Sequence, residues 1–286
     1  MNRFLPILLI LWLLPTVSQA QLRGGFKTGL NFSSLKGPVL SEDGGTETFE
    51  PSTGFHVGPV IQLPITESFG VKAEILYNQA GGKYHFDGNG FNIFRAEDGT
   101  KILATGQKKI DLRLLNTYID VPILAYGRVG AFQVEGGLRL GFLVSSTADG
   151  KLTFSGKTEL GTPVAEQEQT LFYNYKKDKA GEANYSEVTQ ILLDGKKVEI
   201  PSKLGAYFFE DKKEKFFNTF DLGLSVGASY FIGRSLYVGA RANFGLSDVT
   251  NNKADFNQIK TDGLNLIRQA DKDKNFQIQL SVGFSL

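Results

Sequence analysis

The last twelve residues, NFQIQLSVGFSL (275–286), alternate between apolar side chains and small or uncharged polar ones. The apolar positions are Phe276, Ile278, Leu280, Val282, Phe284 and Leu286. A period of two residues is typical of a β-strand whose two faces meet different environments. Terminal residues usually fray, because they lose little by staying mobile. A strand that continues to residue 286 therefore predicts that its edges are paired with other strands.

Seven further segments repeat this alternation, and together the segments predict an all-β fold of eight strands. They cover residues 24–35, 53–63, 111–126, 131–144, 220–230 and 236–246, with one more that begins at Phe69. The phase of the pattern slips at Leu114–Leu115, which predicts a β-bulge there. Pro59 and Pro122 each remove a hydrogen-bond donor from a strand, so we expect bulges or strand ends at both.

The connections between these strands alternate in length. Short ones follow the second, fourth and sixth strands, and long ones cover residues 36–52, 84–110, 146–215 and 248–274. This pattern is typical of outer-membrane barrels. We expect an eight-stranded antiparallel transmembrane β-barrel with both termini in the periplasm and four long extracellular loops. The glycine-rich stretch GGKYHFDGNG (81–90) reaches into the second loop and is interpreted as a loop, and Asp194–Gly195 predicts a hairpin turn in the third.

The two faces of the predicted strands indicate which side meets lipid. No charged residue stands on an apolar face, whereas glycine is frequent on the polar faces. A Lys or Arg facing lipid costs about 2–4 kcal/mol at the bilayer midplane, and glycine suits a narrow interior better than a solvated surface. We predict that the apolar faces contact lipid. Interface girdles are expected from aromatic residues near strand ends, namely Phe26, Phe55, Phe69, Phe132, Phe216, Tyr230 and Phe276.

The predicted lumen contains four charges of each sign. The cations are Lys27, Lys72, Arg139 and Arg241, and the anions are Glu74, Asp120, Glu135 and Asp221. Buried charges need partners, and equal numbers allow complete pairing. We interpret the set as a charge-compensated filling of a lumen too narrow for an open channel. A path for protons or ions is the alternative.

Composition limits the classes of partner. The formal net charge of +1 gives no reason to expect a nucleic-acid partner. The chain has no cysteine, so disulfides and thiolate metal sites are excluded, and no motif indicates a metal or another cofactor. Residues 1–20 resemble a cleavable signal peptide, with an apolar run from Phe4 to Leu14 and a small-residue site ending at Ala20. The predicted domain is then 21–286, and the predicted location is the outer membrane.

Three stretches resemble the PorT-like or "porin family" of small outer-membrane barrel proteins. They are GGFKTGLNFSSLKG (24–37), NTYIDVPILAYGRV (116–129) and LGLSVGASYFIGRSLYVGARANFGLSDV (222–249). The resemblance implies outer-membrane lipid as a partner and insertion by the barrel-assembly machinery, which reads an alternating C-terminal strand. Phe284 and Leu286 would carry that signal, although Leu286 departs from the usual aromatic ending.

The function expected from these observations is a non-enzymatic scaffold or interaction role, exercised through the extracellular loops. Segment 146–215 is the candidate site for a protein or surface ligand, and surface decoration is the alternative reading of it. Three other functions remain open at this point. The family name suggests a subunit of an envelope secretion machine, the barrel suggests a narrow pore, and His85 with Asp87 would be the candidate pair of a rim-located hydrolase.

Overall fold

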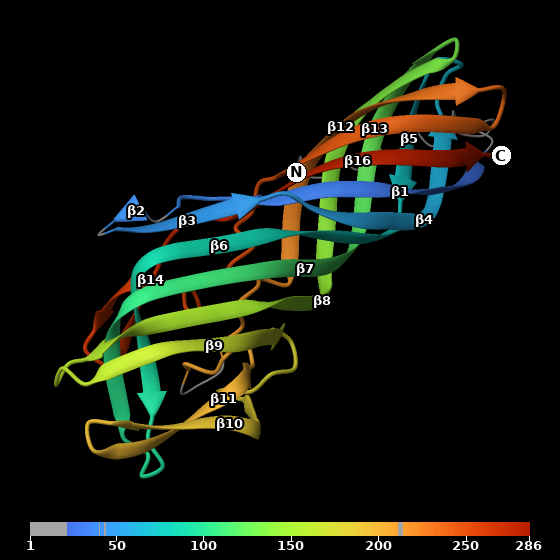
Figure 1. Ribbon diagram of the computed structural model, residues 1–286. Coiled ribbons are helices and arrows are strands. Elements are labelled where there is room, and N and C mark those ends of the chain that lie inside the picture. The colour runs from blue at the N-terminus through green and yellow to red at the C-terminus, as the bar shows by residue number, and fades with distance from the viewer. Residues whose placement is uncertain (1–21, 40, 43, 211–213) are drawn as a thin grey trace, which may run out of the picture.

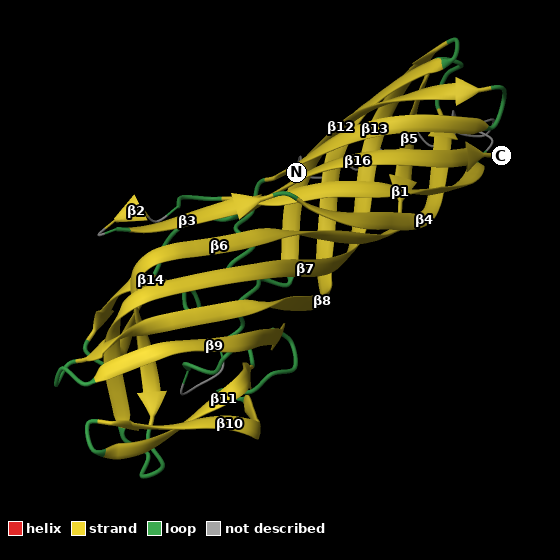
Figure 2. Cartoon of the chain, viewed as in Figure 1, coloured by secondary structure: helices red, strands yellow, loops and turns green. Residues whose placement is uncertain are grey.

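The computed structural model describes residues 22–39, 41–42, 44–210 and 214–286, and the predicted signal peptide lies outside them. The described chain is built from strands (Figure 2). No helix in these residues has the length and apolarity needed to cross a membrane. The strands are β1 (Arg23–Lys36), β2 (Ser41–Glu42), β3 (Gly45–Glu50), β4 (Ser52–Pro64), β5 (Phe69–Glu74), β6 (Leu76–Arg95), β7 (Lys101–Val129), β8 (Phe132–Thr158), β9 (Pro163–Asn174), β10 (Ala183–Leu193), β11 (Lys196–Leu204), β12 (Phe220–Ile232), β13 (Leu236–Gly245), β14 (Phe256–Asp262), β15 (Asn265–Arg268) and β16 (Lys274–Ser285).

Nine of these strands form a closed antiparallel ring with eight positions, because β5 and β6 share one position. The alternation predicts such an eight-stranded ring. The order is β1, β4, β5 continued by β6, β7, β8, β12, β13 and β16, and β16 pairs back with β1. Pairing runs from Gly25–Ser285 to Lys36–Lys274, and β13 occupies the other edge of β16. A closed ring leaves no strand edge unpaired in lipid. This closure is the physical reason for the ordered strand at 275–286.

Beyond the ring, the same sheet continues into a second curved part of the molecule. β6, β7 and β8 continue past the ring, β9, β11 and β10 extend the sheet from β8, and β3 and β2 extend it from β6 (Figure 1). We call the lobe β2, β3, β9, β10, β11, β14 and β15, the outer parts of β6, β7 and β8 (83–95, 101–113 and 146–158), and the described residues that join them. The expectation of irregular loops at 84–110 and 81–90 is therefore wrong, because both belong to a continuous β6–β7 hairpin.

The inward face of β7 changes character between the ring and the lobe. Within the ring, Ile119, Val121 and Ile123 point outward and Asp120 points inward. Within the lobe the polarity is reversed: the inward residues are Ile110, Leu112 and Leu114, and the outward ones are Lys109, Asp111 and Arg113. An apolar outer face suits lipid, whereas a charged outer face suits water. The reversal therefore marks the end of the membrane-spanning part.

This reversal corrects the predicted bulge at Leu114–Leu115. The backbone of β7 keeps its alternation there, and only the polarity of its faces changes. The irregularity lies in β8 instead: Thr117 pairs with Ser145 and Tyr118 with Leu143, so Val144 is the extra residue.

Pro59 and Pro122 interrupt the strand that lies between β4 and β7 in the ring. β4 runs through Pro59 and β7 runs through Pro122, contrary to the expected bulges or ends. The intervening strand is interrupted instead, at Ile75 between β5 and β6. The Ile75 N–H donates to the Pro59 carbonyl at 3.1 Å. Because neither proline can donate in return, regular pairing is lost at this level of the ring.

The ring exposes apolar side chains and buries polar ones, as predicted. Large apolar residues on its outer face include Leu30, Val226 and Leu280, with exposed fractions of 59, 59 and 48%. Cross-strand aromatic pairs lie on the same face, at Phe26–Phe284, Phe55–Tyr77, Phe132–Tyr230 and Phe244–Phe276. Phe216 is the exception among the predicted girdle residues. It packs inside the lobe, with its ring centre 5.1 Å from that of Tyr175.

Glycine on the inner face leaves space for large side chains from neighbouring strands. A Cβ atom on Gly283 would lie 2.4 Å from the ring of Tyr237, and one on Gly70 would lie 2.5 Å from the Tyr126 hydroxyl. Contacts this short are forbidden, so these rings could not occupy the lumen beside a larger residue. The observation agrees with the predicted narrow interior.

Candidate functional site

The eight predicted lumen charges lie inside the ring, and none is more than 7% exposed. They form two clusters. In the first, Arg241 binds Glu74 through two hydrogen bonds of 2.6 and 2.7 Å and also donates to Glu135 from Nε at 2.9 Å. Lys27 pairs with Glu74 at 3.3 Å, and Lys72 pairs with both Glu74 and Glu135. Three cations here meet two carboxylates.

The second cluster has the opposite balance. Arg139 lies between Asp120 and Asp221 and donates hydrogen bonds to both, at 3.0 Å to Asp120 Oδ1. Asn78 donates to Asp120 at 2.7 Å, and Ser247 and Asn275 donate to Asp221 at 2.8 and 2.9 Å. One cation here meets two carboxylates. The excess of each cluster offsets that of the other, so the eight charges sum to zero.

A layer of uncharged polar side chains occupies the same lumen. His56 is fully buried and contacts Asn31 Oδ1 at 2.6 Å and Ser281 Oγ at 3.0 Å. Gln277 and Gln279 contribute further hydrogen bonds from β16. A cavity of about 10 Å³ beside the first cluster is the size of one water molecule. Side chains therefore fill the ring.

The lobe encloses a larger cavity that the sequence did not predict. It has a volume of about 140 Å³. Most of its lining is apolar or aromatic, including Leu112, Leu152, Leu171, Tyr173, Tyr175 and Phe217. Its wall includes residues of β3, β6, β7, β8, β9 and β14, together with residues of the connections after β11 and before β14 and β16. The alternation of apolar and polar residues within 84–113 could have indicated these lobe strands. In this part of the chain, however, the apolar face of the strands points inward.

A few polar groups interrupt this apolar lining. The Lys108 amino group donates to Gln258 Oε1 at 2.8 Å and lies 5.1 and 5.9 Å from the ring centres of Phe91 and Phe209. Burial lowers the pKa of Lys108 to about 7. Near neutral pH this amine is thus divided between its charged and neutral forms, unlike an ordinary lysine.

Replacing Lys108 by methionine should remove a pH dependence of folding. The folded pKa of about 7 lies below the ordinary 10.5, so above pH 7 the unfolded chain holds more protons at this site than the folded chain. Relative to Lys108→Met, wild-type stability should therefore rise by about 2 kcal/mol from pH 7 to pH 9. Urea unfolding in lipid vesicles at both pH values measures this difference. Parallel pH profiles for the two proteins would contradict it.

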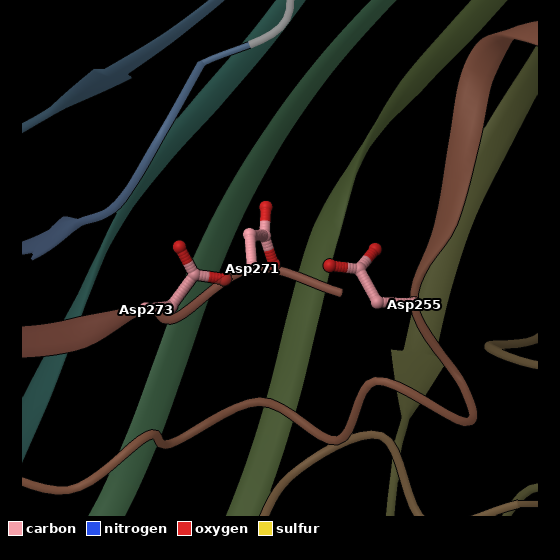
Figure 3. A group of neighbouring side chains, drawn as sticks. All are labelled: Asp255, Asp271 and Asp273. Atoms are coloured by element: carbon pink, nitrogen blue, oxygen red, sulfur yellow. The ribbon is translucent and has the colours of Figure 1, made fainter. Parts of the chain in front are cut away.

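Three carboxylates gather at the cavity wall: Asp255, Asp271 and Asp273 (Figure 3). One oxygen atom of each lies within 4.8 Å of the others. Burial, followed by repulsion between the carboxylates, raises the pKa of Asp255 to about 8 and that of Asp273 to about 6. This group could not be predicted from the sequence, because the β14–β15 hairpin separates Asp255 from the other two.

The predicted pair of His85 and Asp87 is not the pair that the structure forms. His85 Nδ1 lies 2.6 Å from Asp111 Oδ1, directly across the β6–β7 hairpin. Its side chain is 34% exposed, on the water-facing side of the lobe. His85 also lies 3.7 Å from Glu50, so its described acidic neighbours come from β7 and the end of β3.

The residues of the predicted insertion signal lie at the free end of β16. Phe284 points outward and stacks on Phe26, with ring centres 6.4 Å apart. Leu286 is 79% exposed, and its N–H donates to the Gly24 carbonyl at 2.8 Å. Both residues therefore take part in the junction that closes the ring.

Residues 17–251 match the family model described as outer membrane protein beta-barrel domain. The chain belongs to this family. Membership fits the closed ring with its apolar outer face, and it places the protein in the cell outer membrane. The barrel strands thus span the lipid, while the lobe projects from it.

Solved outer-membrane proteins resemble the chain at low identity. Ail, the attachment invasion locus protein of Yersinia pestis, in complex with the heparin analogue sucrose octasulfate, is 11% identical, with 93% of this chain and 99% of that chain covered and a TM-score of 0.34. OprG from Pseudomonas aeruginosa is 13% identical, with 93 and 94% covered and a TM-score of 0.32. The protease OmpT from Escherichia coli is 10% identical, with 92 and 95% covered and a TM-score of 0.30. Comparison with curated protein sequences gives no match.

Proposed function

We propose that this outer-membrane protein is a non-enzymatic binding protein whose filled barrel anchors a ligand-binding lobe at the cell surface. The observation that carries the proposal is the cavity of about 140 Å³ inside the lobe, lined mainly by apolar and aromatic side chains. Beside the first charge cluster of the barrel, the cavity is only about 10 Å³. Binding is therefore assigned to the lobe rather than to the lumen.

Orientation supports a surface location for the lobe. The start of β1, the end of β16 and the short connections after β4, β7 and β12 share one end of the barrel. In outer-membrane barrels the short turns face the periplasm and the long connections face outward. The lobe is formed by the long connections, so it lies at the outward-facing end of the barrel. Its candidate binding segment, 146–215, contributes β9, β10, β11 and half of β8 to the cavity-bearing sheet.

The lining indicates the chemical class of ligand. An apolar cavity of about 150 Å³ in another protein holds one benzene molecule, which is close to the volume in the lobe. Lys108 and the carboxylate of Glu47, which accepts a hydrogen bond from Tyr84 at 2.7 Å, are among the polar groups of a mainly apolar wall. We propose a small aromatic ligand that bears a polar group. The described contacts of His85 with Asp111 and Glu50, away from the cavity, support a binding role rather than hydrolysis.

Indole, which combines an aromatic ring with one N–H donor, is a suitable first probe. The wild type in lipid nanodiscs should bind it with a dissociation constant of about 0.1–1 mM, and Ala206→Phe, which fills the cavity, should weaken binding by at least tenfold. Ala165→Phe is the matched control, because Ala165 is exposed on β9 while Ala206 lines the cavity. Ligand-observed NMR measures binding and also shows whether indole is recovered unchanged. Equal binding by Ala206→Phe and the wild type would refute the assignment.

A role in an envelope secretion machine is the second candidate, and it rests on the PorT-like resemblance. The three stretches that carry this resemblance form β1, the inner part of β7 and the β12–β13 hairpin, all in the barrel. The resemblance thus concerns the anchor, and the lobe lies outside it. Deletion of the gene would block export of secreted enzymes under this alternative, without a change in envelope permeability.

A further inference from the structure

The acidic group forms one part of the wall of the otherwise mainly apolar cavity. We propose that Asp255, Asp271 and Asp273 bind a divalent cation, with Ca²⁺ as the preferred ion. The cation would tie the base of the β14–β15 hairpin to the segment that enters β16. This inference is independent of the aromatic ligand.

The geometry of the three side chains suits one shared ion. Ca²⁺ takes oxygen ligands at about 2.3–2.6 Å, so two oxygens on the same ion lie no more than about 5 Å apart. One oxygen from each aspartate lies within 4.8 Å of the others. The carboxylates of Asp255 and Asp273 point toward Asp271 from either side (Figure 3). All three ligands are carboxylates, which favours a hard cation over a transition metal.

Unsatisfied oxygen atoms provide a second, independent reason. Asp273 is 5% exposed, and its Oδ1 has no hydrogen-bond partner within the described structure. Asp271 Oδ1 is likewise buried without one. A buried carboxylate oxygen without a donor is costly. None of the three aspartates forms an ion pair with a described residue. A cation bound through these two oxygens would satisfy them and offset the negative charge of the group.

Neighbouring groups hold Asp273 in place. Thr250 donates from Oγ1 to Asp273 Oδ2 at 3.0 Å, which leaves Oδ1 available. Asp248 accepts hydrogen bonds from the backbone N–H groups of Thr250 and Asp273, at 3.2 and 3.1 Å. These bonds fix the backbone around the ligand without using its free oxygen. The site is therefore ordered before an ion arrives.

The position of the site predicts what the cation would do. β14 and β15 form a separate two-stranded sheet that is not hydrogen-bonded into the main one. Asp255 directly precedes β14, and Asp271 and Asp273 lie between β15 and β16. An ion shared by these residues would close the base of the hairpin. Since Phe256, Gln258 and Gln269 also line the cavity, the same ion would fix one wall of the binding site.

Calcium titration of the full-length protein in nanodiscs tests the proposal. Isothermal titration calorimetry with CaCl₂ should give a dissociation constant of about 0.1–1 mM, the range of extracellular Ca²⁺ modules. The double variant Asp271→Asn/Asp273→Asn should bind at least tenfold more weakly. Asp262→Asn is the matched control, because it removes one negative charge from an exposed position in the same hairpin, and it should bind like the wild type.

Two readouts separate a metal site from a merely structural role. In EDTA the double variant should be at least as stable as the wild type, because repulsion is relieved, but Ca²⁺ should no longer raise its melting temperature. In the wild type, Ca²⁺ should slow hydrogen exchange across residues 256–273 and leave β10 unchanged, a result that needs no variant. Absence of both Ca²⁺ heat and exchange protection in the wild type would overturn the proposal, as would undiminished binding by the double variant.

Discussion

Replacing Arg139 by methionine is expected to destabilise the barrel by about 3–5 kcal/mol. The guanidinium is the cation that pairs with both Asp120 and Asp221, and all three side chains are at most 4% exposed. Its removal leaves two buried carboxylates whose remaining described partners are uncharged. Removing one partner of a buried ion pair is costly because the other charge stays desolvated and uncompensated. Urea unfolding in lipid vesicles, followed by far-UV circular dichroism, measures the loss.

The triple variant Arg139→Met/Asp120→Asn/Asp221→Asn distinguishes charge from packing. If uncompensated charge is the cause, neutralising both aspartates should recover most of the lost stability. Lys151→Met is the control for a surface pair, since Lys151 and Glu168 are 62 and 58% exposed, and it should cost less than about 1 kcal/mol. A triple variant no more stable than Arg139→Met would show that the charges are not what holds this cluster together.

Replacing Leu280 by arginine is expected to destabilise the protein by about 2–4 kcal/mol. Leu280 lies midway along β16, points outward and is 48% exposed in the isolated chain. In the membrane this exposure is to lipid, where a charge at the midplane is expensive. Unfolding in lipid vesicles and the yield of inserted barrel both measure the effect.

Leu192→Arg provides the matched comparison. Leu192 is 64% exposed on β10 of the lobe, so its surroundings are aqueous and the change should alter stability by less than about 0.5 kcal/mol. The two leucines are alike in type and exposure, and they differ in the solvent that the structure assigns to them. Equal effects at both positions would contradict the division of the molecule into a lipid-facing barrel and a water-facing lobe.

The barrel could be predicted closely because its pattern is local. The β16 segment keeps one alternation from end to end, and β1 keeps it as far as Ser33. Their predicted limits, 24–35 and 275–286, lie within one residue of the observed strands. Charges such as Arg139 and Asp221 could be assigned to the lumen for the same reason. Which of them pair could not be predicted, because that depends on the register of strands far apart in the sequence.

The lobe escaped prediction because its pattern is the reverse of the barrel's. A search for apolar faces that meet lipid reads Ile110, Leu112 and Leu114 as a phase error, whereas they are the inward face of an uninterrupted β7. Phe216 was assigned to the membrane interface for a similar reason, although it packs against Tyr175. An aromatic residue can lie at the membrane interface or pack inside a water-exposed domain. Residue type alone therefore does not distinguish these two locations.

The sequence by itself determined the strands of the barrel, the side of each of them that meets lipid and the closure of the ring by residues 275–286, because side-chain alternation and the cost of charge in lipid act residue by residue. Only the tertiary structure decided that the long connections form a folded lobe, that a cavity lies inside it and that Asp255 meets Asp271 and Asp273. These features arise where segments distant in the chain converge. Their physical basis is the packing of one face against another, which no single stretch of sequence contains.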